Sequence, residues 1–321
     1  MNKDLIVDIG EILWDIYPDG KYLGGAVSNA VFHLKQLGYN PVIVSRIGKD
    51  EPGEKILSIM KEHGLDTKYI QIDQEKKTGT VGIKLKKDGV PVFKCMQNAS
   101  FDYLEWTAEL EELSGKAGVV IFGSFAQRNQ ISRDTIFRFI ENCKNAVKVC
   151  DINLRQNTYK DTKLISRLCN LSDILKLNDT EFSVIKKNFK KEPESEPDFI
   201  NRFIDEFNIT ILLVTLGDKG CAVFTKNECH YEPGNVIEAV DTTGSGDAFT
   251  AGFISGFIQK RSVRESAGFA NRLAAYIAAI KGATPKFTAE DLNNFSSFRK
   301  GKKYSRKFIK LTETKLFKDK T

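Results

Sequence analysis

The chain has 321 residues, of which 41% are hydrophobic, so it can bury one large core arranged in one or two domains. The N-terminal sequence has neither a basic segment followed by an apolar stretch nor a small-residue cleavage site, and no apolar run reaches the roughly eighteen residues that cross a bilayer. These features predict a cytoplasmic protein without a membrane partner.

The net charge of +6 is concentrated at one end of the chain. Residues 299–321 contain ten Lys or Arg and two acidic residues, a net of +8, so the remaining chain carries −2. A nucleic-acid-binding function would therefore rest on this tail alone. We predict a solvated basic extension over residues 291–321 and no nucleic-acid partner.

Cysteine and histidine usage argues against a disulfide framework or a zinc site. Six cysteines are scattered without C-x-x-C pairs, and three histidines show no metal-ligand spacing. The cysteines are expected to be free thiols in a reducing compartment.

Short apolar runs along the chain predict buried strands. They are Leu5–Ile9, Pro41–Ile47, Gly118–Phe122, Val147–Ile152, Ile174–Leu177 and Ile209–Thr215. Segments of helical periodicity lie between most of them, at Ala26–Leu37, Gly53–His63, Ser132–Cys143 and Asp198–Phe207. This alternation predicts a doubly wound α/β fold with a mostly parallel sheet covered by helices on both faces.

Two segments interrupt this alternation. Residues 12–22 and 80–95 show the pattern of antiparallel ribbons, and the second contains the turn residues Lys87-Asp88-Gly89. Both are too amphipathic for the interior of a parallel sheet. We expect them to form a small β-sheet that acts as a lid, with edges that favour a homodimer.

The most specific motif is Asp241-Thr242-Thr243-Gly244-Ser245-Gly246-Asp247, which is followed by an apolar helical run over residues 249–258. Glycines allow backbone N–H groups to form an anion-binding nest, and a helix start adds its positive dipole end. A carboxylate beside such a site suits a catalytic base that accepts a proton from an attacking hydroxyl. The alternative is that Asp247 only caps the helix.

Two other glycine motifs are excluded. The pattern G-x-G-x-x-G fails because Phe249 occupies the third glycine position, and no G-x-x-x-x-G-K-[ST] occurs. Dinucleotide binding and P-loop chemistry therefore lose support.

The Asp241–Phe249 segment resembles the signature of the ribokinase-like, or PfkB, carbohydrate kinases. Gly24–Ala30 resembles the sugar-binding block of that family, Arg46–Gly53 its G-x-D-x-x-G block, and Asn178–Glu181 its N-x-x-E element. The resemblance implies a kinase domain over residues 1–290, with a lid from 12–22 and 80–95 and a basic extension over 291–321.

For the sugar, the resemblance implies binding by Asp15, Gly24, Gly25 and Asn29. A carboxylate and an amide beside glycine backbone suit a polyol, because each can bond two hydroxyls. Alternatively, Asn29 is a residue early in a helix that bonds local backbone.

For the transferred phosphate, the resemblance implies Asp247 as catalytic base, with Gly244, Ser245 and Gly246 around the phosphate. Arg155 lies in a segment that resembles the D-x-N-x-R of fructokinase-type members, where it would meet the phosphate or the sugar. A surface salt bridge is the alternative role for Arg155.

For ATP and metal ions, the resemblance implies a further set of residues. The implied ATP-binding residues are Asn178, Thr215, Gly217, Gly220, Asn271 and Ala274. Glu181 would hold Mg²⁺ through water, and Asp241 and Thr243 border a loop that holds K⁺ in some relatives. The alternatives are a solvated polar turn at Asn178 and Glu181 and ordinary turn residues at the glycines.

The expected function is transfer of the ATP γ-phosphate to a hydroxyl of a free sugar, most consistent with fructose. Segments such as Phe122-Gly123-Ser124 and Ala99-Ser100-Phe101-Asp102 look like bacterial fructokinases. Ribose, 2-keto-3-deoxygluconate and nucleosides remain alternative substrates of the same scaffold. A sugar-sensing protein without catalysis is an alternative of another class.

Overall fold

The computed structural model describes residues 5–85, 91–297 and 301–312. The chain divides into two compact units. Unit 1 contains residues 1–146 and 282–284, and unit 2 contains residues 147–281 and 285–321. The predicted turn at Lys87–Gly89 lies outside the described residues.

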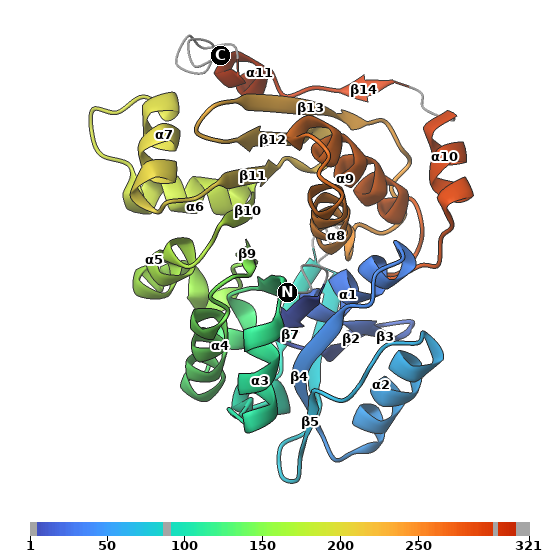
Figure 1. Ribbon diagram of the computed structural model, residues 1–321. Helices are drawn as coiled ribbons and strands as arrows, with labels where there is room; N and C mark the ends of the chain where they lie inside the picture. The colour runs from blue at the N-terminus through green and yellow to red at the C-terminus, as the bar shows by residue number, and fades with distance from the viewer. Residues whose placement is uncertain (1–4, 86–90, 298–300, 313–321) are drawn as a thin grey trace. The chain divides into compact units, whose positions relative to one another are not determined.

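Unit 1 is built on a parallel sheet in the order β8-β1-β4-β5. These strands are β1 (Ile6–Ile9), β4 (Val42–Gly48), β5 (Ile70–Asp73) and β8 (Val119–Phe122). Its helices are α1 (Ala26–Gln36), α2 (Glu51–Glu62), α3 (Ala108–Lys116) and α4 (Gln130–Asn142), with 3₁₀ turns at Ser100–Tyr103 and Phe125–Gln127. Helices α1 and α2 lie on one side of the sheet and α3 and α4 on the other (Figure 1).

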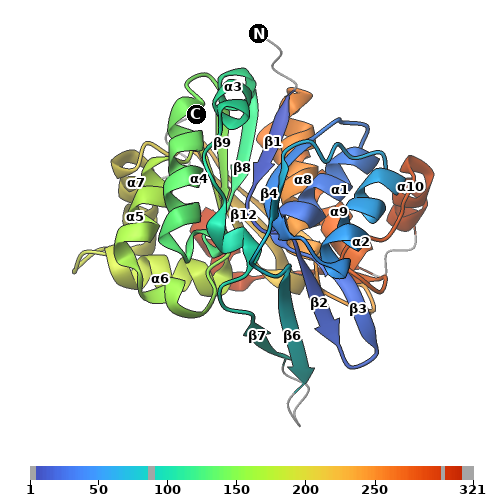
Figure 2. The same cartoon turned by 90° about the horizontal axis from the view of Figure 1, so that it is seen from below.

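A second, four-stranded sheet in unit 1 has the order β3-β2-β6-β7 and projects beyond the helices of this unit (Figure 2). Its strands are β2 (Leu13–Tyr17), β3 (Gly20–Gly24), β6 (Gly79–Leu85) and β7 (Pro91–Cys95). The pairs β2–β3 and β6–β7 are antiparallel, and β2 runs parallel to β6. The two expected ribbons thus form one small sheet, as predicted.

Unit 2 has three parallel strands followed by antiparallel ones. They are β9 (Val147–Asp151), β10 (Ile174–Asn178), β11 (Ile211–Thr215), β12 (Gly220–Phe224), β13 (Cys229–Asn235) and β14 (Lys302–Lys303). Strands β9, β10 and β11 are parallel, whereas β12, β13 and β14 each join their neighbour in antiparallel pairing.

Helices cover both sides of the sheet in unit 2 as well. They are α5 (Thr162–Asn170), α6 (Asp179–Phe189), α7 (Glu196–Glu206), α8 (Ser245–Ile258), α9 (Val263–Ala278), α10 (Ala289–Ser297) and α11 (Arg306–Thr312), with 3₁₀ turns at Gln156–Lys160 and Gly217–Lys219. Helices α5, α6 and α7 lie on one side and α8 and α9 on the other (Figure 1). The predicted α/β fold, with mostly parallel strands, helices on both faces and a small additional sheet, is confirmed.

The basic C-terminal segment differs from the expected solvated extension. Residues 302–312 pack onto unit 2, where β14 extends the sheet and Phe308 and Leu311 of α11 are buried. The apolar side chains recur at helical spacing among the basic ones, so the segment has a buried face despite its charge. A domain boundary between residues 290 and 291 stays a prediction.

All six cysteines are free thiols, and five of them are buried. Burial raises the pKa of the Cys169 thiol to about 12 and also raises the pKa values of Cys150 and Cys221. Within the described ranges, no helix combines the length and apolar character needed to cross a membrane.

Candidate active site

The sugar-binding residues expected in unit 1 lie where β3 leads into α1. Asp15 is on β2, opposite Tyr22 of β3. A Cβ on Gly24 would lie only 2.1 Å from Asp15 Oδ2, so the carboxylate lies directly against the Gly24 backbone. Glycine at position 24 is therefore required for the observed position of the Asp15 carboxylate.

Helix α1 begins at Gly25, its N-cap, which has a φ of 100° and no side-chain capping bond. The Ser28 hydroxyl donates to Gly24 O at 2.8 Å, and Asn29 N donates to Gly25 O at 3.0 Å. Asn29 is buried with 3% exposure. The backbone of Asn29 thus makes an ordinary helical bond, while its side chain is enclosed at the first turn of the helix.

Glu11 lies at the same helix start, and the sequence reasoning did not assign it to the site. Its Oε1 accepts from Ala26 N, the first N–H of α1, at 3.2 Å, and its side chain is buried. A carboxylate at this position interacts favourably with the positive end of the helix dipole. Two features of the sequence could have pointed to Glu11. It is an acidic residue just before the first ribbon, and the N-cap position of the following helix is a glycine, which has no side chain to accept the first helical N–H.

His33 lies one turn beyond Asn29 on α1 and is fully buried. Its Nε2 is 3.0 Å from Ala283 O, which anchors residues 282–284 to this helix. Burial lowers the pKa of His33 to about 4, against the smaller opposing effect of the Ala283 carbonyl. At neutral pH the ring is therefore uncharged and donates Nε2–H to the carbonyl.

The segment Arg46–Gly53 holds the start of β6 in place. Asp50 is the N-cap of α2, accepting from Gly53 N at 3.0 Å, and it also accepts from Thr78 N at 2.9 Å and Thr78 Oγ1 at 2.5 Å. Burial acts to raise the pKa of Asp50, but the hydrogen bonds from Thr78 and Gly53 outweigh it and hold the pKa below its ordinary value. Asp50 therefore fixes Thr78, the residue immediately before strand β6 of the small sheet.

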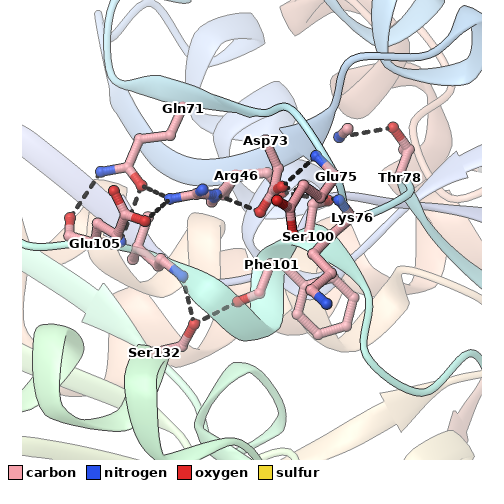
Figure 3. Close-up of polar contacts among 12 residues, drawn as sticks. Arg46, Gln71, Asp73, Glu75, Lys76, Thr78, Ser100, Phe101, Glu105 and Ser132 are labelled. Atoms are coloured by element: carbon pink, nitrogen blue, oxygen red, sulfur yellow. Dashed lines mark hydrogen bonds and ion pairs between the residues drawn. The ribbon is translucent and has the colours of Figure 1, made fainter.

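Arg46 forms the centre of a polar network beside this segment (Figure 3). Its guanidinium is 2.8 Å from Asp73 Oδ2 and 2.9 Å from Glu105 Oε1, and its carbonyl accepts from Ser100 Oγ at 3.0 Å. Next to Ser100, the Phe101 ring lies so near Gly79 that a Cβ there would be 2.6 Å from Cε1. The network thus supports the base of the small sheet.

The Gly244–Asp247 turn in unit 2 starts helix α8. Gly244 is the N-cap with a φ of 74°, and Ser245, Gly246 and Asp247 are the first three residues of the helix. Before it, Asp241 Oδ1 accepts from Thr243 N at 2.9 Å. Asp247 is half-buried and is the third residue of the helix, after the N-cap Gly244.

Lys176 lies beneath this turn, and the sequence reasoning missed it. It is a β10 residue with 6% exposure, in register with Asp151 of β9. Its Nζ is 2.6 Å from Asp151 Oδ2, which also accepts from Thr250 Oγ1 of α8 at 2.9 Å. A Cβ on Gly246 would lie 3.0 Å from the same Nζ.

The charge of Lys176 is stabilised by carboxylates around it. Burial acts to lower the pKa of Lys176, but the negative charges of Asp151 and Asp247 outweigh burial and raise it above its ordinary value. A permanent cation therefore lies against the first turn of α8, where helical N–H groups already favour an anion. The turn is suited to hold phosphate.

Asn178 and Glu181 form a reciprocal capping box at the start of α6. Asn178 Oδ1 accepts from Glu181 N, and Glu181 Oε2 accepts from Asn178 N, both at 2.8 Å. The other carboxylate oxygen of Glu181 accepts from Leu154 N at 2.9 Å. Burial, together with the nearby charge of Asp151, raises the pKa of Glu181. The pair is therefore not the solvated polar turn considered above.

These contacts fix the loop that contains the D-x-N-x-R residues. Leu154 is held by Glu181, and Arg155, the next residue, is exposed. Asn153 has a φ of 41°, which turns the chain sharply at this point. The loop thus presents the Arg155 side chain to solvent while its backbone is tied to α6.

The other expected ATP-binding residues of unit 2 lie on β11, on the turn into β12 and on α9. Thr215 ends β11, with Oγ1 3.4 Å from Leu177 O, and Gly217 and Gly220 form the turn into β12. Asn271 of α9 donates from Nδ2 to Pro233 O of β13 at 3.0 Å. Ala274 lies one turn further along α9 and is half-buried.

Comparison with known proteins identifies the chain at the family level. The model of the pfkB family of carbohydrate kinases matches residues 19–289. The chain belongs to this family. The match includes the Gly24–Asn29 segment, the Asn178–Glu181 capping box and the turn at Asp247, and it ends before β14 and α11.

Proteins with curated names and proteins with solved structures resemble most of the chain. A probable fructokinase-5 from Arabidopsis thaliana is 29% identical over 310 residues, covering 88% of this chain and 94% of the relative. A fructokinase with bound ATP from Xylella fastidiosa superposes with a TM-score of 0.81 at 20% identity, covering 92% and 98%. A fructokinase double mutant from Vibrio cholerae with fructose, ADP and potassium ion bound has a TM-score of 0.77 at 23% identity, covering 91% and 98%.

The family match confirms the expected sugar-kinase function. The roles of individual residues remain predictions, because the family match assigns none of them. The catalytic roles of Asp247 and Lys176 are likewise proposals.

Proposed function

We propose that this carbohydrate kinase is an ATP-dependent fructokinase in which Asp247 is the general base. The observation that carries the proposal is the buried Lys176–Asp151 pair against the first turn of α8. The pair places a cation beside helical N–H groups, and it leaves a carboxylate, Asp247, in the same turn. An anion site and a base so close together suit phosphoryl transfer to a hydroxyl.

In the proposed reaction, Asp247 accepts the proton of the sugar hydroxyl as its oxygen bonds to the γ-phosphorus of ATP. The bond between this phosphorus and the β–γ bridging oxygen breaks, and ADP leaves with the electron pair. Ser245 N already donates to Thr242 O at 3.2 Å, so the N–H groups of Gly244 and Gly246, with the Lys176 charge, stabilise the negative charge on the transferring group. Arg155, which is exposed, would meet the phosphate or the sugar.

Unit 1 supplies the proposed sugar contacts through Asp15, Asn29 and the backbone of Gly24 and Gly25. Asp15 and Glu11 are both carboxylates near the start of α1. Acceptors of this kind suit neutral hydroxyls and disfavour an anionic substrate. A free sugar therefore fits better than a sugar phosphate.

The proposed nucleotide contacts are Asn178, Thr215, Gly217, Gly220, Asn271 and Ala274. Magnesium bound to the phosphates would neutralise part of their charge. Glu181 would act on it only through water, since both of its oxygens already accept backbone N–H groups. A potassium ion at the loop of Asp241 and Thr243 is proposed by analogy with the Vibrio cholerae fructokinase.

We propose a cytoplasmic location and a homodimer. The free, buried thiols suit a reducing compartment. The small sheet ends in two edge strands, β3 and β7, which offer unpaired backbone groups to a second copy. The same sheet is proposed as the lid that excludes water from the reaction.

The test is an ATP-coupled assay of the full chain with fructose, ribose, 2-keto-3-deoxygluconate and adenosine, repeated with Asp247→Asn. The amide keeps the size of the side chain but cannot accept the proton. We expect fructose to give the highest kcat/KM and the variant to lose about 10²- to 10⁴-fold in kcat. The melting temperature and ATP affinity should stay near the parent values.

Three results would change the proposal. Faster turnover of another sugar would replace fructose as the substrate. Sugar binding without ADP release would support a sensor without catalysis. An Asp247→Asn variant that retains kcat within a few-fold of the parent would remove Asp247 as the base.

A further inference from the structure

Residues 301–312, the C-terminal clamp, lie outside the matched family region and contact the turn proposed to bind ATP. Strand β14 pairs with β13, placing Lys303 opposite Gly234. The turn itself packs closely on β13, because a Cβ on Gly220 would lie 2.0 Å from Glu232 O. Strand β13 is thus in contact with the clamp and also with the turn.

A first contact from the clamp is an ion pair. Lys303 Nζ is 2.8 Å from Asp218 Oδ2, in the middle of the Gly217–Lys219 turn. Both side chains are about half exposed, so the pair is screened and contributes little to stability. The pair can nevertheless restrict the conformations of the turn.

A second contact runs through a tyrosine of β13. Ser305 N donates to Tyr231 Oη at 2.6 Å, and Tyr231 Oη donates to Lys219 O at 2.6 Å. The single hydroxyl therefore connects the backbone of the clamp with the backbone of the turn. A phenylalanine at position 231 would keep the ring and lose both bonds.

A third set of contacts anchors the clamp to α6 through Phe308 and to the start of α7 through Lys307. The ring centroids of Phe308 and Phe182 are 6.1 Å apart, and Phe308 is buried. Lys307 Nζ is 2.9 Å from Glu196 Oε1. Helix α6 begins with the capping box of Glu181, the residue next to Phe182. The clamp is therefore attached to the Gly217–Lys219 turn and to α6, two of the elements that carry proposed nucleotide contacts.

Lys302 extends the same arrangement toward α9. Its Nζ is 3.1 Å from Glu232 Oε1 and 3.2 Å from Asn235 Oδ1. Asn235 Nδ2 in turn donates to Asn271 O at 3.4 Å, and Asn271 is a proposed adenine contact. The clamp thus reaches three proposed nucleotide-binding elements through short chains of contacts.

We propose that the C-terminal clamp positions the Gly217–Gly220 turn for ATP, with Tyr231 and Lys303 as positioning residues. This inference rests on the proposed assignment of that turn to the nucleotide. A turn held in one conformation binds its ligand without a further loss of conformational entropy. Releasing the turn should therefore weaken ATP binding and leave sugar binding unchanged.

The main test is Tyr231→Phe in the full chain, with Tyr304→Phe as the matched control. Tyr304 lies in the clamp and is 57% exposed. We expect Tyr231→Phe to raise the KM for ATP and the Kd for ADP about three- to tenfold, the loss typical of one or two hydrogen bonds. The KM for the sugar should stay within about twofold of the parent value. The Tm should stay within about 2 °C of the parent value.

A charge exchange tests the ion pair separately. Lys303→Glu should raise the KM for ATP about two- to threefold, and adding Asp218→Lys should restore it. Lys303→Arg, which keeps the charge, should behave like the parent.

Failure of the clamp and failure of the proposed function give different results. If the parent protein phosphorylates a sugar with ATP but Tyr231→Phe leaves the KM for ATP and the Kd for ADP unchanged, the clamp proposal is overturned. An equal rise in the KM values for ATP and sugar, accompanied by a lower Tm, would also overturn it, because it indicates general destabilisation. If the parent neither binds ADP nor uses ATP, the assignment of the turn is wrong.

Discussion

Helix α1 of unit 1 and helix α8 of unit 2 both begin at a glycine with positive φ, 100° at Gly25 and 74° at Gly244. Neither N-cap supplies a side-chain hydrogen bond. At α1, the carboxylate of Glu11 accepts from the first N–H of the helix. At α8, the ammonium of Lys176 lies against Gly246 in the first turn.

The two helix starts therefore share a glycine N-cap with positive φ, although ψ is 129° at Gly25 and −6° at Gly244, and they have opposite neighbouring charges. A helix start that already interacts with a carboxylate has less attraction for a further anion, and its acceptors suit neutral hydroxyls. A helix start with a buried cation attracts anions more strongly than the dipole alone. On the proposed function, similar glycine-rich sequences thus favour different ligands, and the difference lies in residues distant in the chain.

Removing the cation at α8 should have the largest effect. Lys176→Met leaves Asp151 buried without its partner, which typically costs about 3–5 kcal/mol of unfolding free energy. It also removes stabilisation of the transferred phosphate, so we expect kcat to fall about 10²-fold. Circular dichroism melting and steady-state kinetics measure the two effects.

A double variant separates structure from electrostatics at this site. Asp151→Asn with Lys176→Met carries no unpaired charge, and the new amide can still accept from the Thr250 hydroxyl, so most of the stability should return. The kcat should stay low. Recovery of kcat together with stability would mean that Lys176 supports folding only.

Acid should affect the α1 region selectively through His33. Its pKa in the folded protein, about 4, lies below the ordinary 6.5, so the folded state binds fewer protons than the unfolded state between these values. The stabilising contribution is full above pH 6.5 and is lost as the pH falls to about 4, a change of about 3 kcal/mol. Urea denaturation of His33→Gln, which does not titrate, should show a flatter dependence over this range. The same slope in parent and variant would contradict this assignment.

Displacing the Asp15 carboxylate should weaken sugar binding at the start of α1. Gly24→Ala places a methyl group 2.1 Å from the present position of Oδ2 and must displace the carboxylate. We expect the KM for the sugar to rise about tenfold, with a smaller change in kcat and none in the KM for ATP. Gly20→Ala in the same hairpin is the control, since its methyl would lie 3.6 Å from the Tyr22 ring. Equal kinetics of the two alanine variants would remove Asp15 from the sugar site.

Neutralising Glu11 should have the smallest effect. Glu11→Gln keeps an oxygen that can accept from Ala26 N but removes the negative charge at the start of α1. We expect inhibition by fructose phosphates to strengthen about two- to threefold, while the KM for free fructose changes less. Product-inhibition kinetics at low ionic strength measure the difference, and unchanged inhibition would show that Glu11 does not select against anions.

The sequence predicted much of this arrangement because its signals are local. Alternating strands and helices, the two ribbons and the glycine turn before α8 each follow from residues close together in the chain. Lys176 gave no such signal, since it lies within an apolar strand and its partner Asp151 is on a different strand. Its role depends on strand pairing, which periodicity does not reveal.

Burial of two side chains in the C-terminal segment was missed for a related reason. A high density of Lys and Arg usually indicates solvent, and here it concealed Phe308 and Leu311, which become buried. Glu181 illustrates the reverse case, because its spacing from Asn178 suggested a ligand role and the structure also shows a capping box. Motif spacing does not separate these roles, since both need the same helical turn.

The labelling rates of the buried cysteines can be used to measure local unfolding of this protein. A thiol reacts with alkylating reagents as its thiolate, and burial both blocks access and raises the pKa of Cys169 to about 12. Near pH 8 the buried thiols should therefore be labelled only when the surrounding structure opens. Cys95 and Cys143 lie in unit 1, and Cys150, Cys169 and Cys221 lie in unit 2. Site-resolved labelling rates would consequently time the opening of each unit separately, without any introduced probe.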